Sequence, residues 1–584
     1  MEKRRIIYIT AQSVISDLQD TAGRRKALDR LHVGQFDHVV LESYRGGLSV
    51  DELILRVTRD FFQGEGLETS GGLMPVHGPD FGKASEGVEL RAPFFCYSAE
   101  ETVDALETEI LKLAGLFERI VIDDAFLTAC RCTRCREARG DRDWPEFRRD
   151  LLCNVARRWT KAAHEVNHEV ELTVKFPQYY DRYHRFGYDA ERFPEIFDAV
   201  WVGTETRNPE TPAFGYVEPY QGYVNAEWMS AHAGDKFQCA WFDSLDCDEQ
   251  LFYEQALTTT LAAPPATAVF CYGDTLFSGS KIQRLVDAAP LLEHLREVAV
   301  APKGVYTIKP PNSDGGGDLF IFDYLGMLGV PCKPATRLDI DMPCAFVPAH
   351  AVENEENRER IKQLVEHGNT VIASFNALAR MVGYPEMLEL FGYDGAGVMA
   401  LSAKAAGFEI GKERFPLESP VRLPGDLAPF DAQVLVHARL DAPVGGPLRI
   451  PAATLRKHPS GGRAIVWNMG TFGHDAFEIT APLNVPVKTD LFRWPKGVLD
   501  ILRNTATEPL GFRIDTLPGV ACFVFERRFV LLNYSSGARE VSVDGIVLKP
   551  ATLVSDSANT RCTQTEFFLA PRSIASVEPA SAAG

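Results

Sequence analysis

Short apolar runs alternate with polar stretches of helical period through the first three hundred residues of the chain. Eight runs have strand-like length, at residues 5–10, 38–43, 66–76, 119–124, 169–176, 199–205, 237–243 and 267–272. Helical patterns, such as those at residues 99–116 and 147–166, lie between most of them. This alternation predicts about eight βα units, the number in a (β/α)8 or TIM barrel.

Beyond the predicted barrel the pattern changes twice. Strands and helices alternate up to about residue 508, with β-rich insertions between residues 398 and 450, and the tail is rich in strands. We therefore expect a barrel at residues 1–302, a smaller α/β domain at residues 303–508 and a small antiparallel β-domain at residues 509–584. A stretch rich in Pro and Gly at residues 310–317 is expected to be a linker or the entry to the second domain.

Composition narrows the class of protein. The 584 residues are 45% hydrophobic and 24% charged, which is typical of soluble globular proteins. A formal net charge of −19 disfavours nucleic acid and anionic membranes as partners. No apolar run is long enough to span a membrane or to form a signal peptide, so a cytoplasmic location is expected.

Three closely spaced cysteines favour a metal site. Cys130, Cys132 and Cys135 form a Cys-x-Cys-x-x-Cys pattern shortly after the fourth predicted strand. Thiolates bind zinc in tetrahedral geometry, and a structural zinc site needs four ligands. Cys96, in the loop before the helix that precedes this strand, is the candidate for the fourth ligand. The alternative is that these are reduced side chains of a loop.

Carboxylates end three of the predicted strands. The fourth strand ends in Asp123-Asp124, the sixth near Glu205 and the seventh in Asp243. Barrel enzymes carry their chemistry at this end of the strands, and a pair of facing carboxylates can cleave a glycosidic bond. We predict Asp124 as the general acid/base, with a pKa raised by Asp123 or by burial, and Glu205 or Asp243 as the second carboxylate. Helix capping, or an ion pair of Glu205 with Arg207, is the structural alternative.

Other side chains near these strand ends are expected to bind the substrate: Glu42, Asp123, Lys175, Arg207, Trp241 and Tyr272. Trp241 and Tyr272, with Tyr179 and Tyr180, suit stacking against sugar faces. Lys175 could instead form a Schiff base or lie at the surface. Glu42 could instead pair with Arg45.

Motifs around the cysteines resemble the family 42 glycoside hydrolases, which are β-galactosidases. They are Arg91-Ala92-Pro93-Phe94-Phe95-Cys96-Tyr97-Ser98, then a predicted helix, then Ile122-Asp123-Asp124, then Cys130-Arg131-Cys132-Thr133-Arg134-Cys135. The resemblance implies a catalytic barrel, a trimerisation domain with a class I glutamine amidotransferase fold, and a small C-terminal β-domain. It also implies a carbohydrate substrate, a homotrimer, and zinc bound by the four cysteines.

The chain departs from this family at its catalytic positions. The family has Asn-Glu where this chain has Asp123-Asp124, and a glutamate nucleophile on the strand that here ends in Asp243. A divergent glycoside hydrolase is therefore expected, with a metal-dependent sugar lyase or isomerase and a carbohydrate-binding protein with a decayed site as the alternatives. Cys332 and Cys344 lack the Gly-x-Cys-x-Gly elbow, so the second domain is not expected to be a glutamine amidotransferase.

Overall fold

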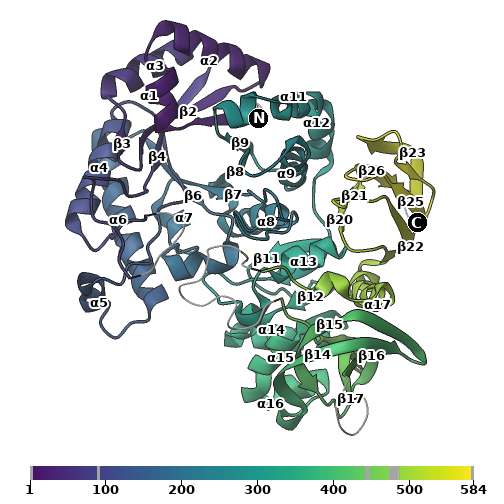
Figure 1. Cartoon of the computed structure of the whole chain (residues 1–584). Helices are drawn as coiled ribbons and strands as arrows, with labels where there is room; N and C mark the ends of the chain where they lie inside the picture. Colours follow the sequence, from purple (N-terminus) through teal and green to yellow (C-terminus); the bar gives the residue numbers. More distant parts are fainter. Residues whose placement is uncertain (1–3, 88–92, 441–447, 472–484, 486, 581–584) are drawn as a thin grey trace. The chain divides into compact units, whose positions relative to one another are not determined.

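The computed structural model describes residues 4–87, 93–440, 448–471, 485 and 487–580 (Figure 1). Arg91 and Ala92 of the motif before Cys96 lie outside the described residues. The chain divides into two units, one of residues 1–293 with 478–486 and the other of residues 294–477 with 487–584. The three-domain division made from the sequence stays a prediction.

Eight parallel strands form a closed barrel in the first unit. They correspond to the eight apolar runs and are β1 (Arg4–Ile9), β2 (His38–Arg45), β4 (Glu68–Met74), β5 (Arg119–Ile122), β6 (Glu171–Phe176), β7 (Ala199–Gly203), β8 (Phe237–Asp243) and β9 (Ala266–Phe270). The barrel closes because β1 pairs with both β2 and β9, with Ile6 opposite His38 on one side and Ala268 on the other. The predicted TIM barrel is confirmed.

Helices alternate with these strands along the chain. They are α1 (Ala11–Asp17), α2 (Thr21–Val33), α3 (Glu52–Gly64), α4 (Glu100–Ala114), α5 (Thr133–Arg139), α6 (Trp144–Val166), α7 (Phe193–Ile196), α8 (Gln221–Ala233), α9 (Glu249–Leu261), α10 (Asp274–Phe277), α11 (Lys281–Asp287) and α12 (Ala289–Val298). A short strand, β3 (Leu48–Ser49), pairs antiparallel with the end of β2. The predicted helices at residues 99–116 and 147–166 correspond to α4 and α6.

Large aromatic side chains fill the barrel interior. Tyr8, Trp201 and Trp241 are buried in one apolar cluster contributed by alternate residues of the strands. A Cβ at Gly72 in β4 would lie 2.8 Å from the hydroxyl of Tyr8, so the glycine makes room for this ring. This packing explains why the third strand of the barrel has a weak apolar pattern.

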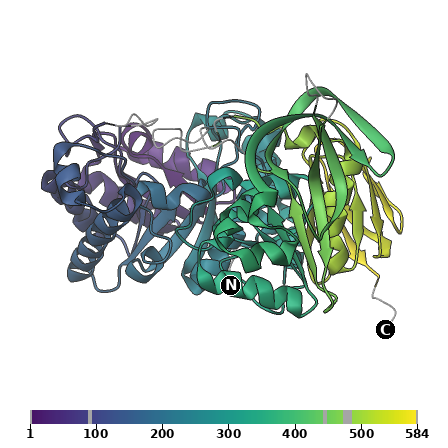
Figure 2. The ribbon, with the colours of Figure 1, turned by 90° about the horizontal axis from the view of Figure 1, so that it is seen from below.

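A nine-stranded mixed sheet forms the first part of the second unit. Its parallel half is β11 (Cys332–Ala335), β10 (Val305–Ile308), β12 (Cys344–Val347), β13 (Thr370–Ser374) and β18 (Arg463–Trp467). Its antiparallel half is β17 (Leu448–Lys457), β16 (Gln433–Leu440), β14 (Val398–Ile410) and β15 (Glu413–Leu427), whose long strands are seen in Figure 2. The helices are α13 (Ile321–Met327), α14 (Glu355–Glu366), α15 (Phe375–Arg380), α16 (Pro385–Phe391) and α17 (Lys496–Thr507).

The glycine stretch at residues 315–317 follows β10 and packs tightly within this unit. A Cβ at Gly315 would lie 2.7 Å from His350, and one at Gly317 would lie 2.8 Å from Asn376. Of the two roles predicted for this stretch, entry to the second domain therefore fits the structure and a free linker does not.

Two four-stranded antiparallel sheets end the chain. One contains β19 (Arg513–Asp515), β22 (Arg539–Asp544), β25 (Glu566–Leu569) and β24 (Arg561–Cys562), and the other contains β20 (Val520–Val524), β21 (Phe529–Asn533), β26 (Ile574–Pro579) and β23 (Leu548–Ser555). They enclose a core that includes Phe512, Phe529 and Phe567. The predicted fold class, a barrel followed by an α/β domain and an antiparallel β-domain, is confirmed.

Candidate active site

The carboxyl ends of the barrel strands bring most of the predicted site residues together. Parallel strands of a barrel share this end, which is where such folds carry their chemistry. Six ionisable side chains lie in or just past strands β2, β5, β6, β7 and β8: Glu42, Asp123, Asp124, Lys175, Glu205 and Asp243.

The ammonium group of Lys175 joins two of the predicted carboxylates. Its Nζ lies 2.5 Å from Oδ2 of Asp124 and 2.6 Å from Oε1 of Glu205. A third carboxylate, that of Asp123, lies 3.5 Å away. Because one nitrogen contacts both oxygens, the carboxylates of Asp124 and Glu205 lie at most about 5 Å apart, the separation typical of retaining glycosidases.

Strand alternation directs Lys175 into the barrel. Phe176, its neighbour in β6, faces outward and packs against Tyr183 and Phe193 with ring centroids 5.1 and 5.9 Å away. Lys175 therefore points inward, where the ring centroid of Trp241 lies 4.6 Å from its Nζ. The side chain of Lys175 is only 2% exposed. It is thus a fully buried cation of the barrel and not the surface lysine that the sequence left open.

Burial gives the carboxyl groups of the site different pKa values. It raises the pKa of Glu205 to about 7 although Lys175 acts to lower it. Burial and the charge of Asp124 raise the pKa of Asp123 to about 6. Burial also acts to lower the pKa of the Lys175 ammonium, but Asp124 and Glu205 outweigh it and the pKa is raised. A carboxyl group that holds a proton near neutral pH therefore lies beside a permanent cation.

Glu42 forms the ion pair with Arg45 that the sequence offered as an alternative to substrate binding. Its carboxylate accepts hydrogen bonds from Arg45 Nε and Nη2 at 2.9 and 2.8 Å, from the Tyr8 hydroxyl at 2.7 Å and from the Ala11 amide at 2.6 Å. Arg45 Nη2 also reaches Asp123 at 3.4 Å. Glu42 is fully buried and its oxygens are engaged by these protein groups.

Asp243 is held by Arg207. The Nε and Nη2 of the guanidinium donate to Oδ2 of Asp243 at 2.8 and 2.5 Å, and Nε lies 3.0 Å from Oδ1. The guanidinium also covers the ring of Phe214 at 3.8 Å from its centroid. Arg207 thus pairs with Asp243, whereas the ion-pair partner of Glu205 is Lys175.

Two of the four aromatic rings predicted to stack on sugars, those of Trp241 and Tyr272, are engaged by the protein. Trp241 is 2% exposed and packs against Tyr8 and Phe270, with ring centroids 4.9 and 5.6 Å away. The ring of Tyr272 packs against Phe277 at 5.6 Å, and the guanidinium of Arg30 lies 5.7 Å from its centroid. A sugar that stacks on either ring has to displace one of these neighbours.

Unpaired polar atoms beside Asp124 indicate a place for a bound molecule. The hydroxyl of Tyr179 and the second carboxylate oxygen of Glu205, Oε2, are buried and have no hydrogen-bond partner among the described residues. Burial and the charge of Asp124 raise the pKa of Tyr179. Buried polar atoms almost always have a partner, so these two atoms await a ligand or water. The sequence offered Tyr179 only for stacking and gave no sign of this free hydroxyl.

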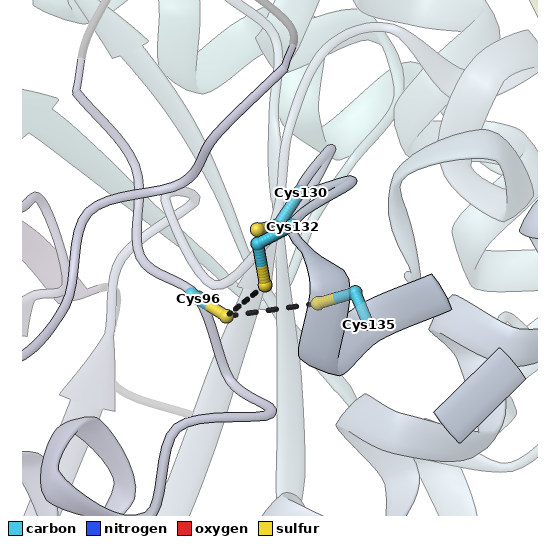
Figure 3. A group of neighbouring side chains, drawn as sticks. All are labelled: Cys96, Cys130, Cys132 and Cys135. Atoms are coloured by element: carbon cyan, nitrogen blue, oxygen red, sulfur yellow. Dashed lines mark hydrogen bonds between the residues drawn. The ribbon is translucent and has the colours of Figure 1, made fainter. Parts of the chain in front are cut away.

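The four predicted cysteine ligands meet in a buried cluster (Figure 3). All four sulfur atoms lie within 4.8 Å of one another. Sγ of Cys96 lies 3.8 Å from Sγ of Cys132 and 3.6 Å from Sγ of Cys135. Tetrahedral zinc with Zn–S bonds of about 2.3 Å requires sulfur atoms about 3.8 Å apart. The donor set and its spacing therefore suit a metal ion such as zinc.

Neighbouring groups support these sulfur atoms. The amide of Glu86 donates to Sγ of Cys130 at 3.3 Å, and the Ser98 hydroxyl lies 3.2 Å from Sγ of Cys135. Such contacts orient the side chains that bind the ion in metal sites. Cys130 and Cys132 lie between β5 and α5, so the cluster holds the loop that follows Asp124.

The barrel matches a known family model. Residues 2–287 match the family model described as "Probable glycosyl hydrolase, catalytic domain". An uncharacterized protein of Saccharolobus solfataricus is 21% identical over 363 residues, which cover 56% of this chain and 59% of that protein. The chain thus spans less than two thirds of the length of this curated relative.

Solved structures share the fold over the full length. The β-galactosidase from Bacillus circulans sp. alkalophilus has a TM-score of 0.64 at 11% identity and 99% coverage of both chains. A GH42 β-galactosidase from G. stearothermophilus has a TM-score of 0.63 at 10% identity, covering 99% of this chain and 98% of that one. The β-galactosidase of Halorubrum lacusprofundi has a TM-score of 0.62 at 12% identity, covering 98% and 99%. The predicted likeness to family 42 is confirmed at the level of the fold.

Among the residues that the structure describes, the helices lack the length and apolar character needed to span a bilayer.

Glu205→Gln should weaken the pH dependence of barrel stability. Between about pH 4.5 and 7 the folded protein keeps a proton on Glu205 that the unfolded chain has released, so stability falls as the pH rises through this window. Glutamine does not ionise. The fall in unfolding free energy across this pH window should therefore be smaller in the variant by about 3 kcal/mol. Thermal midpoints measured across this window test the prediction. Parallel curves for the wild type and the variant contradict a raised pKa of Glu205.

Gly203→Ala should dislodge Glu205. A Cβ at this position would lie 2.1 Å from Oε2 of Glu205, so the carboxylate has to move away from Lys175. We expect the unfolding free energy to fall by about 1–3 kcal/mol, measured by thermal or denaturant unfolding. Gly279→Ala is the matched control, because a Cβ there meets nothing within 4 Å. Equal losses in the two variants would show that Glu205 is not confined as described.

Proposed function

We propose that the barrel hydrolyses a glycosidic bond of a carbohydrate, with Asp124 and Glu205 as the catalytic pair. The observation that supports this most is the shared contact with Lys175, since it keeps the two carboxylates within about 5 Å of each other. That separation favours a retaining mechanism through a covalent glycosyl-enzyme intermediate. The family match of the barrel and the buried, unpaired hydroxyl of Tyr179 beside Asp124 fit the same proposal.

Glu205 is the proton donor in this proposal and Asp124 the nucleophile. Of two carboxyl groups, the one with the raised pKa is suited to act as the acid, and burial raises the pKa of Glu205 to about 7. Asp124 has a side chain that is 25% exposed and lies 2.5 Å from the ammonium group of Lys175, which can hold the carboxylate in place as the nucleophile. The sequence analysis assigned the acid/base role to Asp124. In this proposal Glu205 has that role and Asp124 is the nucleophile.

Asp243 is a positioning residue in this proposal. Its carboxylate is 2% exposed and forms a two-point ion pair with Arg207, whose other contact is the ring of Phe214. A nucleophile fixed in this way would have to break a buried ion pair before reacting, at a cost of several kcal/mol. Glu205 differs from Asp243 in that its second oxygen, Oε2, has no hydrogen-bond partner among the described residues.

A metal-dependent lyase or isomerase is the less favoured alternative. The space between Asp124, Glu205 and Asp123 is filled by the ammonium of Lys175, which is where a divalent cation would have to bind. Within the described part of the chain, the group with metal-binding geometry is the cysteine cluster. Activity that EDTA abolishes, without glycoside turnover, would support the alternative. Sugar binding without turnover would support a decayed site.

We also propose that the cysteine cluster binds a structural zinc ion. Cys96, Cys130, Cys132 and Cys135 would complete a closed four-sulfur shell that has no position left for a substrate. The ion would tie the loop after β5 to the loop before α4, and so hold the chain that carries Asp124. Assembly as a homotrimer and a cytoplasmic location stay predictions, the first from the resemblance and the second from the composition.

Asp124→Ala should lower turnover of an active aryl glycoside by about a thousandfold or more. Azide should then restore turnover and give the glycosyl azide of inverted configuration, because it occupies the space of the lost nucleophile. Asp235→Asn, an exposed change in the segment before β8, is the control. Near-normal turnover of a folded Asp124→Ala variant, or an azide product of retained configuration, contradicts the role of Asp124.

Cys132→Ser should remove the metal and lower the thermal midpoint. The purified protein is expected to contain one zinc ion per chain by elemental analysis, and a three-sulfur site should hold it far more weakly. Cys562→Ser, in a strand of the C-terminal sheets, is the matched control. A metal-free wild type with an unchanged midpoint in the Cys132→Ser variant would contradict a zinc site.

A further inference from the structure

A cavity lies on loops that follow strands β5 and β6 of the barrel. It has a volume of about 260 Å³ and is lined by Arg139, Trp144, Pro145, Arg148, Arg185 and Phe186, with Asp143 at its edge. These residues come from α5, from the start of α6 and from the 3₁₀ segment Tyr180–Phe186 that follows β6. We call this cavity the arginine pocket.

Guanidinium groups surround one indole ring beside the arginine pocket. Those of Arg131, Arg139 and Arg148 lie 5.4, 5.1 and 5.2 Å from the ring centroid of Trp144. Among the described residues, none of the three forms an ion pair with a carboxylate. Each has a buried Nε–H group without a hydrogen-bond partner in the same part of the chain. Three clustered cations with unused donors need an anion close by.

Other protein groups neutralise only part of the positive charge of these arginines. Among the described residues that line the pocket, Asp143 is the one acid, and its carboxylate caps α6 by accepting from the amide of Glu146 at 2.7 Å. Arg148 uses two other N–H groups on the carbonyls of Arg185 and Ala129, at 2.7 and 3.0 Å. Zinc with four thiolates would carry a charge of about −2, which balances two of the arginines at most. Arg139 remains in excess, in a chain whose net charge is −19.

The arginine pocket is close to the candidate active site. Phe186, in its wall, packs against Tyr179 with ring centroids 6.0 Å apart. Tyr179 in turn lies beside Asp124. Burial raises the pKa of the Tyr179 hydroxyl, and the charge of Asp124 raises it further. One aromatic ring therefore separates the pocket from the residues around the catalytic pair.

We propose that the arginine pocket binds the anionic group, a carboxylate or a sulfate ester, of an acidic carbohydrate. Guanidinium forks match the geometry of such oxyanions, and a desolvated pocket strengthens the contact. The small volume suits a single charged group or one acidic sugar unit. Anion binding by the pocket stands by itself, whereas its use as a subsite for the substrate rests on the proposed hydrolase function.

Calorimetric titration of the full-length protein with sodium sulfate, sodium glucuronate and glucose tests the proposal. We expect both anions to bind and glucose not to bind. Arg139→Gln should weaken anion binding about tenfold, the effect of one charge-assisted hydrogen bond. Arg157→Gln, an equal change of charge on the exposed side of α6, should leave it unaltered. The thermal midpoint of each variant confirms that it is folded.

The outcomes separate the pocket from the catalytic proposal. No anion binding, or binding that Arg139→Gln does not weaken in a folded variant, overturns the pocket. Sulfate binding without glucuronate binding reduces it to an adventitious ion only. If an acidic aryl glycoside is turned over, Arg139→Gln should raise its KM and leave that of a neutral glycoside unchanged. Anion binding in a protein that turns over no glycoside leaves the pocket standing and contradicts the hydrolase function instead.

Discussion

The buried ammonium of Lys175 is the contact on which the candidate active site depends. Five carboxyl groups and three cations meet at one end of the barrel, and Lys175 is the cation that touches carboxylates from two other strands. Its charge is almost completely shielded from water, so each of these ion pairs is strong and each is lost at high cost. The acids outnumber the bases by two, and burial raises the pKa of two of them, that of Glu205 to about 7 and that of Asp123 to about 6.

The remaining charges are arranged around this contact. Arg45 and Arg207 form ion pairs with Glu42 and Asp243, which is why the proposal assigns the chemistry to Asp124 and Glu205. The tightly packed rings of Tyr8 and Trp241 in the barrel interior support this arrangement. The cysteine cluster fixes the loop after β5 from the outside, and the arginine pocket lies on the next part of that loop. The proposed nucleophile, three of the four cysteines and part of the arginine pocket thus lie on consecutive parts of one chain segment.

The sequence predicted the barrel well because each strand has its own apolar run. It also predicted the four-cysteine cluster, since the Cys-x-Cys-x-x-Cys spacing left one ligand to find. It missed β10 and β11, whose four residues each are too short for a clear pattern. The sequence singled out Lys175 and Glu205 but did not predict the ion pair between them. Which side chains of different strands meet depends on the register of the barrel strands. Raised pKa values likewise follow from burial, which spacing along the chain does not reveal.

The spacing of Asp124 and Glu205 across one ammonium makes a definite statement about stereochemistry. Two carboxylates about 5 Å apart leave no room for a water molecule between the sugar and its attacking group, so the first product should keep its anomeric configuration. The most direct measurement is proton NMR of the anomer formed first from an aryl glycoside that the protein cleaves. The account predicts retention. Inversion, or the absence of turnover across a broad panel of glycosides by the folded, metal-loaded protein, would contradict it.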